Sequence, residues 1–297
     1  MYNYKMIGLG KMGYNLFLNM IEQGLSVKGY DHSEQQRRRC DYQEHIIDNF
    51  EDLFDEKLNV YWMMLPAGEV TQTMFEKILT KAKPGDIIID AGNAHYESSI
   101  QKYNLAFDKD IDFIDIGVSG GQEGARHNGC MMLGGDNRVF SKIESDLSKL
   151  CTEGGLLFAG KPGSGHYLKM VHNGIEYGMM QSIAEGFNIL KHSDHYDFVH
   201  SDVARLFNSG SVVRSWLMEL TQNAFTNNED LDNIQGIVAS SGEGKWTVEE
   251  ALRLQVNIPV ISQSLFVRYA SQDTMRFGEK VTASLRNQFG GHAVVEE

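Results

Sequence analysis

The stretch that decides the predicted fold reads Gly8-Leu9-Gly10-Lys11-Met12-Gly13. It follows an apolar segment over residues 4–9 and opens a helical pattern over residues 13–23. The first glycine permits a tight turn, the second lets a pyrophosphate approach the backbone, and the third lets helix and strand pack closely. The helix N-terminus then offers N–H groups and a partial positive charge to phosphates. We therefore predict a dinucleotide site in this turn, against the simpler reading of a glycine-rich turn without a ligand.

Short apolar segments alternate with helical patterns as far as about residue 160. The expected strands cover residues 4–9, 27–30, 58–65, 86–90 and 113–118, with helices between them such as 13–23 and 70–81. Alternation of this kind predicts a parallel sheet with helices on both faces. We expect an α/β fold in which residues 1–162 form a Rossmann-like, doubly wound sheet.

The second half of the chain reads as helical throughout. Helical patterns cover residues 165–191, 202–207, 212–224, 247–255 and 261–285, without strand alternation. Glycine and proline cluster over residues 160–165, which favours a domain boundary there. Residues 163–297 are expected to form an all-α domain for substrate binding and oligomerisation.

The next strand after the glycine turn ends at Asp31, about twenty residues further on. An acid at this place can accept hydrogen bonds from the adenosine ribose, and it would repel the additional phosphate of NADP. This favours NAD as the cofactor, with NADP as the alternative, because His32 and the arginines 37–39 lie close by. A second reading is that Asp31 only caps the following helix.

Three further loops fall at predicted strand ends. They contain Leu65 and Pro66, then Asn93, and then Ser119-Gly120-Gly121. Each loop could be plain turn chemistry. Because ligands of open α/β sheets bind outside the carboxyl ends of the strands, a shared site is favoured.

Four polar residues of the long helix, Lys169, His172, Asn173 and Glu176, share one face through their spacing at i, i+3, i+4 and i+7. A base, an imidazole, an amide and a carboxylate are an unusual set for a solvated face. Gly174 lies among them, where a glycine costs about 1 kcal/mol relative to alanine. The residues alone leave both a catalytic face and an ordinary solvated face open. We find no convincing set of metal ligands beside His172 and no nucleophile elbow.

Composition limits the class of protein. The chain has 297 residues, 42% hydrophobic content and a net charge of −13, which argues against nucleic acids and anionic membranes as partners. Cys40, Cys130 and Cys151 form no metal-binding spacing and are expected to be reduced thiols. We see no signal peptide and no apolar run of about 20 residues, so a cytoplasmic protein is expected.

Residues 163–177, which read GSGHYLKMVHNGIEY, closely resemble the catalytic helix of the 6-phosphogluconate dehydrogenases. Part of this pattern is shared with the wider β-hydroxyacid dehydrogenase superfamily. Residues 90–93 and 118–121 resemble the family's nicotinamide and substrate loops, residues 244–247 its phosphosugar motif, and residues 286–292 its C-terminal signature. The resemblance spans almost the whole chain, whose length is similar to that of the family's shorter branch.

The resemblance implies oxidative decarboxylation of 6-phosphogluconate to ribulose 5-phosphate and CO2, a step of the pentose phosphate pathway, with reduction of NAD or NADP and without a metal. Lys169 would take the proton of the 3-hydroxyl and then stabilise the enolate that forms when CO2 leaves. Glu176 would protonate C1, and His172 and Asn173 would complete the catalytic set. The cofactor would contact Gly8, Gly10, Lys11, Met12, Gly13, Asp31, Leu65, Pro66 and Asn93.

The resemblance also implies the substrate contacts. The hydroxyls and the carboxylate would be held by Asn93, Ser119, Gly120, Gly121, His172 and Asn173. The phosphate would be held by Tyr177, Lys245, Thr247 and an arginine, for which Arg276 is favoured over Arg268. Arg286 and His292 would reach the site of a neighbouring subunit, which implies a homo-oligomer, either a dimer or a tetramer.

One departure from the family pattern and two alternative functions remain at this point. Longer family members carry an arginine and a threonine after the second strand for the NADP phosphate, where this chain has Asp31-His32-Ser33. A different β-hydroxyacid dehydrogenase, acting on 3-hydroxyisobutyrate or tartronate semialdehyde, would need neither the phosphate ligands nor Glu176. A catalytically inactive nucleotide-sensing or scaffold protein could also use the same fold.

Overall fold

A computed structural model describes residues 2–296 of the chain. The chain divides into two compact units, Met1–His172 and Asn173–Glu297, and the division falls inside the long helix α7 (Ser164–Lys191). Within residues 2–296, every strand of the sheet belongs to the first unit, and the second unit is helical. The predicted fold class is therefore confirmed.

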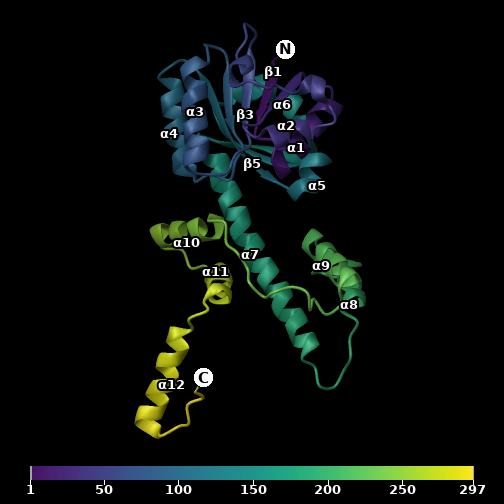
Figure 1. Ribbon diagram of the computed structural model, residues 1–297, viewed down its shortest axis with the longest axis vertical. Helices are drawn as coiled ribbons and strands as arrows, with labels where there is room; N and C mark the ends of the chain where they lie inside the picture. Colours follow the sequence, from purple (N-terminus) through teal and green to yellow (C-terminus); the bar gives the residue numbers. More distant parts are fainter. Residues whose placement is uncertain (1, 297) are drawn as a thin grey trace. The chain divides into compact units, whose positions relative to one another are not determined.

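The first unit contains one seven-stranded sheet in the order β2-β1-β3-β4-β5-β6-β7 (Figure 1). Its strands are β1 (Asn3–Ile7), β2 (Val27–Tyr30), β3 (Asn59–Met63), β4 (Ile87–Asp90), β5 (Asp112–Ser119), β6 (Gly129–Gly135) and β7 (Cys151–Gly160). The first five strands are parallel, so their carboxyl ends share one edge of the sheet. The glycine turn and the three predicted loops all follow these ends.

The five expected strands are parallel, whereas β6, which follows them, runs antiparallel to β5 and pairs Cys130 with Ser119. Only the short helix α5 (Gly121–Arg126) separates the two strands. A parallel neighbour needs a crossover of about a dozen residues or more, whereas a short connection returns the chain antiparallel. The last two strands were not predicted, because β6 and β7 are rich in glycine.

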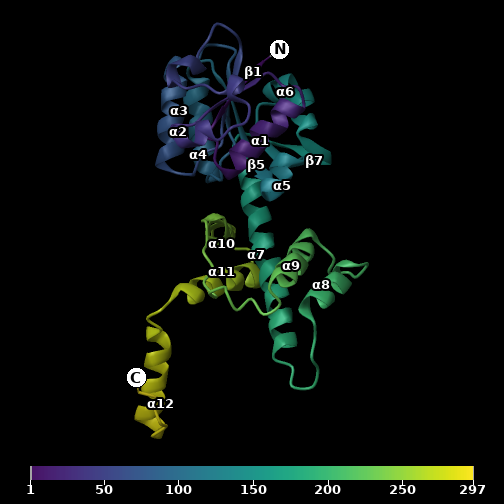
Figure 2. The ribbon, with the colours of Figure 1, turned by 45° about the vertical axis from the view of Figure 1, so that its right-hand side comes forward.

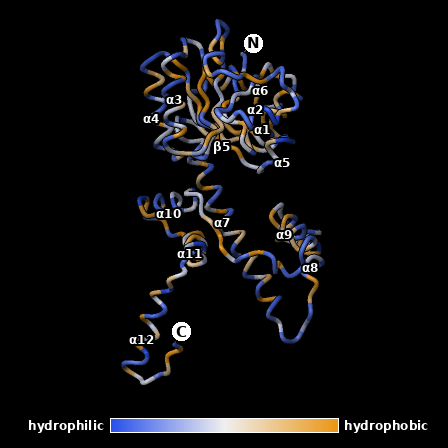
Figure 3. Tube along the Cα trace, in the orientation of Figure 1, coloured by the Kyte–Doolittle hydropathy of each residue, from blue (hydrophilic) through white to orange (hydrophobic). Residues whose placement is uncertain are grey.

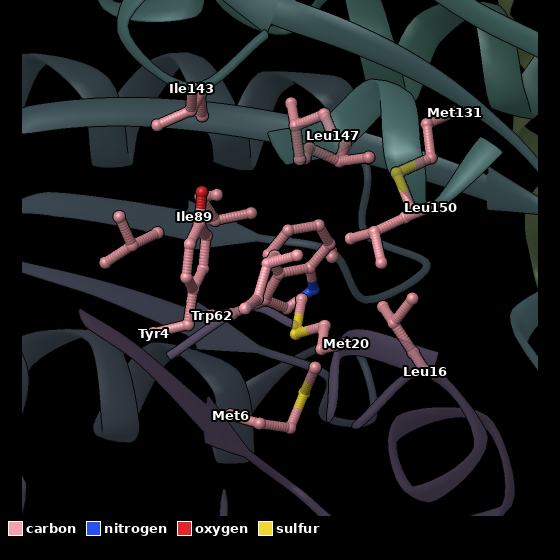
Figure 4. Packing of buried hydrophobic residues seen from close by; sticks show 14 of the residues in the cluster. Tyr4, Met6, Leu16, Met20, Trp62, Ile89, Met131, Ile143, Leu147 and Leu150 are labelled. Atoms are coloured by element: carbon pink, nitrogen blue, oxygen red, sulfur yellow. The ribbon is translucent and has the colours of Figure 1, made fainter. Parts of the chain in front are cut away.

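Helices cover both faces of the sheet (Figures 1 and 2). On one face, α1 (Lys11–Glu22) and α6 (Asn137–Lys149) pack on a core that includes Tyr4, Trp62 and Ile89 (Figure 4). On the other face, α3 (Glu69–Lys81) and α4 (Tyr96–Phe107) pack on a second core. The short α2 (Glu34–Arg38) follows β2. The strands are apolar on both sides because both sides are covered.

The second unit contains, after the C-terminal part of α7, the helices α8 (His200–Asn208), α9 (Trp216–Asn227), α10 (Glu243–Leu254), α11 (Pro259–Gln272) and α12 (Phe277–Gly290). Phe187 of α7 packs with Ala204 of α8 and Met218 of α9 in a small core. Hydrophilic and hydrophobic stretches alternate along α7 and α12 (Figure 3).

Two helix predictions in this unit were wrong. The helix expected over residues 212–224 begins only at Trp216, because Ser215 caps it by accepting a hydrogen bond from the Met218 N–H at 3.1 Å. The single helix expected over residues 261–285 is two helices. Asp273 Oδ1 accepts bonds from the N–H groups of Met275 and Arg276, and Arg276 has a left-handed φ of 49°, which ends α11 and starts α12.

No helix within residues 2–296 is both long and apolar enough to cross a bilayer.

Candidate active site

The glycine turn has the geometry that a dinucleotide requires. Gly8 has a φ of 98°, and a Cβ at Gly8 would lie 2.4 Å from the Met64 carbonyl oxygen. A Cβ at Gly13 would lie 2.0 Å from the Gly8 carbonyl oxygen, whereas a Cβ at Gly10 meets nothing within 4 Å. No side chain caps α1 at Gly10. The outer glycines therefore shape the turn, and the middle one leaves the helix N-terminus, with Lys11 and Met12, open to a pyrophosphate.

Asp31 is buried at the end of β2, and its carboxylate is bonded to the backbone on both sides. Oδ2 accepts a hydrogen bond from the Leu9 N–H and Oδ1 accepts one from the Ser33 N–H, each at 2.8 Å. The carboxylate thus ties the glycine turn to the start of the following loop. Because a carboxylate has about four acceptor positions, it can still accept bonds from ribose hydroxyls.

The three arginines near Asp31 all have partners. Arg37 donates to the Asp31 carbonyl at 2.6 Å and also pairs with Asp48. Arg39 donates to the Leu9 carbonyl at 2.6 Å, and its guanidinium lies 4.9 Å from the centre of the Tyr14 ring. Arg38 pairs with Glu34 on the surface of α2. The charges of Arg37 and Arg38 are thus compensated by carboxylates, which leaves these two side chains less available to a second phosphate.

The loop with Asn93 is fixed by a buried ion pair that the sequence did not suggest. The Lys102 ammonium of α4 lies 2.7 Å from Asp90 Oδ2, and the two side chains are 2% and 0% exposed. Asp90 Oδ1 accepts a bond from the Gly92 N–H at 3.2 Å, and Lys102 also donates to Ser98. The pair holds the end of β4 and the first residues of the loop in place.

The loop with Leu65 and Pro66 lies beside the Asn93 loop. A Cβ at Gly92 would lie 2.5 Å from the Leu65 carbonyl oxygen, so the two loops touch at their backbones. The Pro66 carbonyl accepts a bond from the Thr71 hydroxyl at 2.7 Å, which fixes the loop to α3. Two of the predicted loops are thus brought together.

The loop with Ser119 meets the start of α7. Ser119 Oγ and His172 Nε2 are hydrogen-bonded at 3.1 Å, and Gly120 and Gly121 have φ values of 113° and 60° that favour glycine. A Cβ at Gly117 would lie 2.4 Å from the Lys169 Cβ. Lys169 is therefore packed against β5 with only 7% of its surface exposed.

The polar face of α7 continues into the second unit with Asn173, Glu176 and Tyr177. Tyr177 is buried, and the N–H of Ser241 donates to its hydroxyl at 3.3 Å. The Arg268 guanidinium lies 3.5 Å from the centre of the Tyr177 ring, in a cation–π contact. The start of α10 thus joins this group through Ser241.

The glycines of this part of the second unit are needed for close packing. A Cβ at Gly174 would lie 2.7 Å from Thr247 Cγ2, and one at Gly244 would lie 2.4 Å from the Tyr177 ring. The structure therefore brings Tyr177 and Thr247 together with Gly244 where α7 meets α10. Lys245, on the same helix turn, is largely exposed and lies 3.3 Å from Glu249.

The remaining predicted residues belong to α12 and its flanks. Arg276 lies at the start of α12, and its N–H donates to Asp273. Arg286 lies on α12, a helix without buried residues, and His292 follows that helix. Arg268, the less favoured arginine in the sequence, is the one that contacts Tyr177. In residues 2–296 no group of three His, Cys, Asp or Glu side chains is placed to hold a metal ion.

Comparison with known proteins matches both units. Residues 3–158 match the family described as the NAD binding domain of 6-phosphogluconate dehydrogenase, and residues 165–292 match the C-terminal domain of the same enzyme. The chain is 46% identical to YqeC of Bacillus subtilis, a candidate 6-phosphogluconate dehydrogenase, over 97% of each protein. It is 34% identical to the NAD(+)-dependent, decarboxylating 6-phosphogluconate dehydrogenase of Haloferax volcanii over 98% of each.

A solved structure shows the same likeness over a longer protein. The 6-phosphogluconate dehydrogenase of Plasmodium falciparum, determined without ligands, with NADP+ and with 6-phosphogluconate, is 30% identical with a TM-score of 0.82. The comparison covers the whole of this chain and 66% of that one.

The ion pair beneath the Asn93 loop leads to a prediction about stability. Lys102→Met should lower the free energy of unfolding by about 3–5 kcal/mol, because it leaves the Asp90 carboxylate buried without its countercharge. Arg38→Met, which removes an exposed pair with Glu34, should cost at most about 1 kcal/mol. Urea unfolding followed by circular dichroism measures both; equal effects of the two variants would contradict the assignment.

Proposed function

Because the chain belongs to the 6-phosphogluconate dehydrogenase family, we propose that it oxidises and decarboxylates 6-phosphogluconate to ribulose 5-phosphate and CO2 with NAD+. The observation that carries the proposal is the polar face of α7. Lys169 is buried against Gly117 on β5, and Glu176 follows it two helical turns later. An amine and a carboxyl group on one helix face can serve two successive proton transfers.

Lys169 is the proposed base. The reaction needs a neutral amine to take the proton of the 3-hydroxyl, and burial of the side chain favours the uncharged form of an amine. A nicotinamide cofactor, when bound, would supply the acceptor for the hydride of C3. Lys169, protonated by this step, then donates a hydrogen bond to the new carbonyl and stabilises the enolate that forms as CO2 leaves.

Glu176 is the proposed acid, which delivers a proton to C1 of the enediol. Two groups are needed because Lys169 must remain at the C3 oxygen while C1 is protonated. His172 and Asn173 lie between them on the same helix face, and the bond of His172 to Ser119 supports a role in holding the substrate's hydroxyls or carboxylate. Asn93 and the Gly120-Gly121 turn are proposed to complete that part of the site.

NAD is the proposed cofactor, with its pyrophosphate at Gly8, Gly10, Lys11, Met12 and Gly13. The buried carboxylate of Asp31 would accept bonds from the ribose and repel a 2′-phosphate. Arg37 and Arg38 support this preference because each of them is paired with a carboxylate. Leu65, Pro66 and Asn93 are proposed to line the path towards the nicotinamide.

The phosphate of the substrate is proposed to bind at Tyr177, Lys245, Thr247 and Arg268. Arg268 touches the Tyr177 ring and donates to the Ala239 carbonyl, and no carboxylate in residues 2–296 forms an ion pair with it. Its charge is therefore available to an anion, and a guanidinium can bind two phosphate oxygens at once. This contact with Tyr177 is the reason to prefer Arg268 over Arg276.

A homo-oligomer, either a dimer or a tetramer, is proposed from the surface of α12. Phe277, Val281, Leu285 and Phe289 recur every four residues along this helix, and all four are exposed. A helix with an apolar stripe normally buries it against another element. We assign the covering surface to a second copy of the chain, which would also bring Arg286 and His292 to the neighbouring site.

The cysteines support the proposed location in the cytoplasm. Cys40, Cys130 and Cys151 are free thiols. Burial raises the pKa of Cys151 to about 12, so this thiol stays protonated at neutral pH. Unpaired cysteines of this kind are typical of a reducing compartment.

The first prediction of this proposal concerns Lys169. The parent chain should form NADH and CO2 in equal amounts from 6-phosphogluconate, and Lys169→Met should lower kcat by about 10²–10⁴-fold, because general base catalysis is lost. The affinity for NAD+, measured by titration calorimetry, should stay unchanged. Lys161→Met, an exposed lysine before α7, is the matched control. NADH formation without CO2 from the parent would instead indicate a non-decarboxylating hydroxyacid dehydrogenase.

A second prediction separates the two arginines. Arg268→Lys should raise KM for 6-phosphogluconate by roughly 10–100-fold, which corresponds to about 1.5–3 kcal/mol for hydrogen bonds to a charged group. Arg276→Lys should leave KM within about threefold of the parent by the same scale. Activity on unphosphorylated gluconate should be affected equally little by both changes. The reverse order of the two KM values would assign the phosphate to Arg276.

The third prediction concerns cofactor choice. Asp31→Asn should raise the ratio of kcat/KM for NADP+ to that for NAD+ by about tenfold, because about 1.4 kcal/mol of charge repulsion is removed. Asp41→Asn, an exposed acid in the loop after α2, should leave the ratio unchanged. An unaltered ratio in Asp31→Asn would show that Asp31 has only a structural role, through its bonds with Leu9 and Ser33.

A further inference from the structure

The first turn of α7 is bonded to a buried carboxylate of the sheet. Asp115 lies on β5 with none of its surface exposed. Its Oδ1 accepts a hydrogen bond from the Gly163 N–H at 2.7 Å, and its Oδ2 accepts one from the His166 N–H at 2.9 Å. These bonds satisfy N–H groups that a helix start leaves unpaired, and the carboxylate is stabilised by the helix dipole.

The same turn lies in backbone contact with the sheet. A Cβ at Gly165 would lie 2.5 Å from the Met132 carbonyl oxygen, and a Cβ at Gly134 would lie 2.7 Å from the N atoms of both Ser164 and Gly165. Glycine surfaces bring a helix close, but they offer no side chains that interlock. The contact therefore sets how near α7 lies to β5 and β6, while its rotation about its own axis depends on directional bonds.

His166 supplies such a bond. Its Nδ1 is hydrogen-bonded to Ser99 Oγ of α4 at 2.6 Å, and the two residues are 1% and 0% exposed. Its other ring nitrogen, Nε2, is buried and has no hydrogen-bond partner among residues 2–296. An apolar ring of similar size would fill the same space without a buried, unpaired nitrogen. The imidazole is therefore best explained by its directional bond to Ser99.

Ser99 is itself held on a fixed helix. Its neighbours on α4, Ser98 and Lys102, are bonded to each other, and Lys102 is paired with Asp90 at the end of β4. The ring of Tyr96, also on α4, contacts the ring of Tyr167 edge to face at 5.1 Å. The bond between Ser99 and His166 therefore connects α7, through α4, to the end of β4, which the Asn93 loop follows.

We propose that His166, through its buried hydrogen bond to Ser99, is a positioning residue that fixes the rotation of α7 and so the direction of Lys169. His166 and Lys169 are three positions apart on α7 and share one helix face. The end of a long side chain lies roughly 6 Å from the helix axis, so a rotation of about 10° would move the amine of Lys169 by roughly 1 Å. A misplacement of about 1 Å can cost on the order of 10²-fold in rate.

The test compares His166→Phe, Ser99→Ala and the double variant with the parent. Each should lower kcat by about 10–100-fold, and the double variant should fall no further than the single ones, because all of them remove the same bond. KM for NAD+ should not change. The melting temperature of His166→Phe should stay close to that of the parent, because removal of the buried unpaired nitrogen offsets the loss of the partner of Ser99. The deuterium isotope effect with substrate labelled at C3 should rise as hydride transfer becomes limiting.

His166→Asn provides the rescue. Its amide can take the place of Nδ1 beside Ser99, so kcat should return to within about threefold of the parent. The inference is overturned if His166→Phe keeps kcat within about twofold of the parent, or if His166→Asn is as slow as His166→Phe at an equal melting temperature. The inference rests on the proposed function, but its failure looks different: a wrong function appears as an inactive parent, a wrong positioning role as unaffected variants.

Discussion

The backbone contact between the start of α7 and the strands β5 and β6 is the constraint on which the first unit's part of the candidate site depends. Glycines at positions 117, 134 and 165 make it possible, since a Cβ at any of them would lie only 2.4–2.6 Å from its nearest neighbour. This approach buries Lys169 beside the loop that contains Ser119. β5 ends, and the antiparallel β6 begins, at the edge where the glycine turn and the Asn93 loop lie, so one packing requirement gathers the predicted residues of the first unit.

Two buried carboxylates support this edge, and they are stabilised in different ways. Asp90 is compensated by the ammonium of Lys102, whereas Asp115 is compensated by backbone N–H groups at the start of a long helix. A charge removed from water is costly unless it is paired or fully hydrogen-bonded. Each solution also fixes an element: the first holds a loop, and the second holds a helix. The polar interior of this unit therefore specifies geometry more than it adds net stability.

The sequence predicted those parts of the fold and site that depend on local spacing. The glycine turn and the shared face of Lys169, His172, Asn173 and Glu176 follow from two short stretches of chain. β6 was missed because its glycines weaken the apolar strand pattern. Its antiparallel direction follows from a short connection, which apolar patterning does not reveal. The break at Asp273 depends on one side chain bonding two N–H groups, within a stretch that otherwise has helical periodicity.

The contacts that the site residues make in the folded protein were harder to predict than their positions in the sequence. Arg268 and Arg276 both lie near the expected place in the sequence, and only the packing of α11 shows which of them reaches the Tyr177 ring. The sequence did not mark Lys102, Asp115 or His166 as important. Their roles depend on buried bonds to residues elsewhere in the chain, and no local motif indicates such bonds. Asp31 was predicted with two alternative roles, and its bonds to Leu9 and Ser33 show a third that the spacing could not indicate.

The distribution of charge explains how an acidic chain can offer a site to an anionic substrate. With a net charge of −13, the protein as a whole repels a phosphorylated acid. Many of its cations, such as Lys5, Arg126 and Lys142, are paired with carboxylates. Arg268 instead stacks on an aromatic ring and donates to a carbonyl, contacts that orient a guanidinium without neutralising it. Local attraction then depends on which cations are left without a carboxylate, and much less on the total charge of the protein.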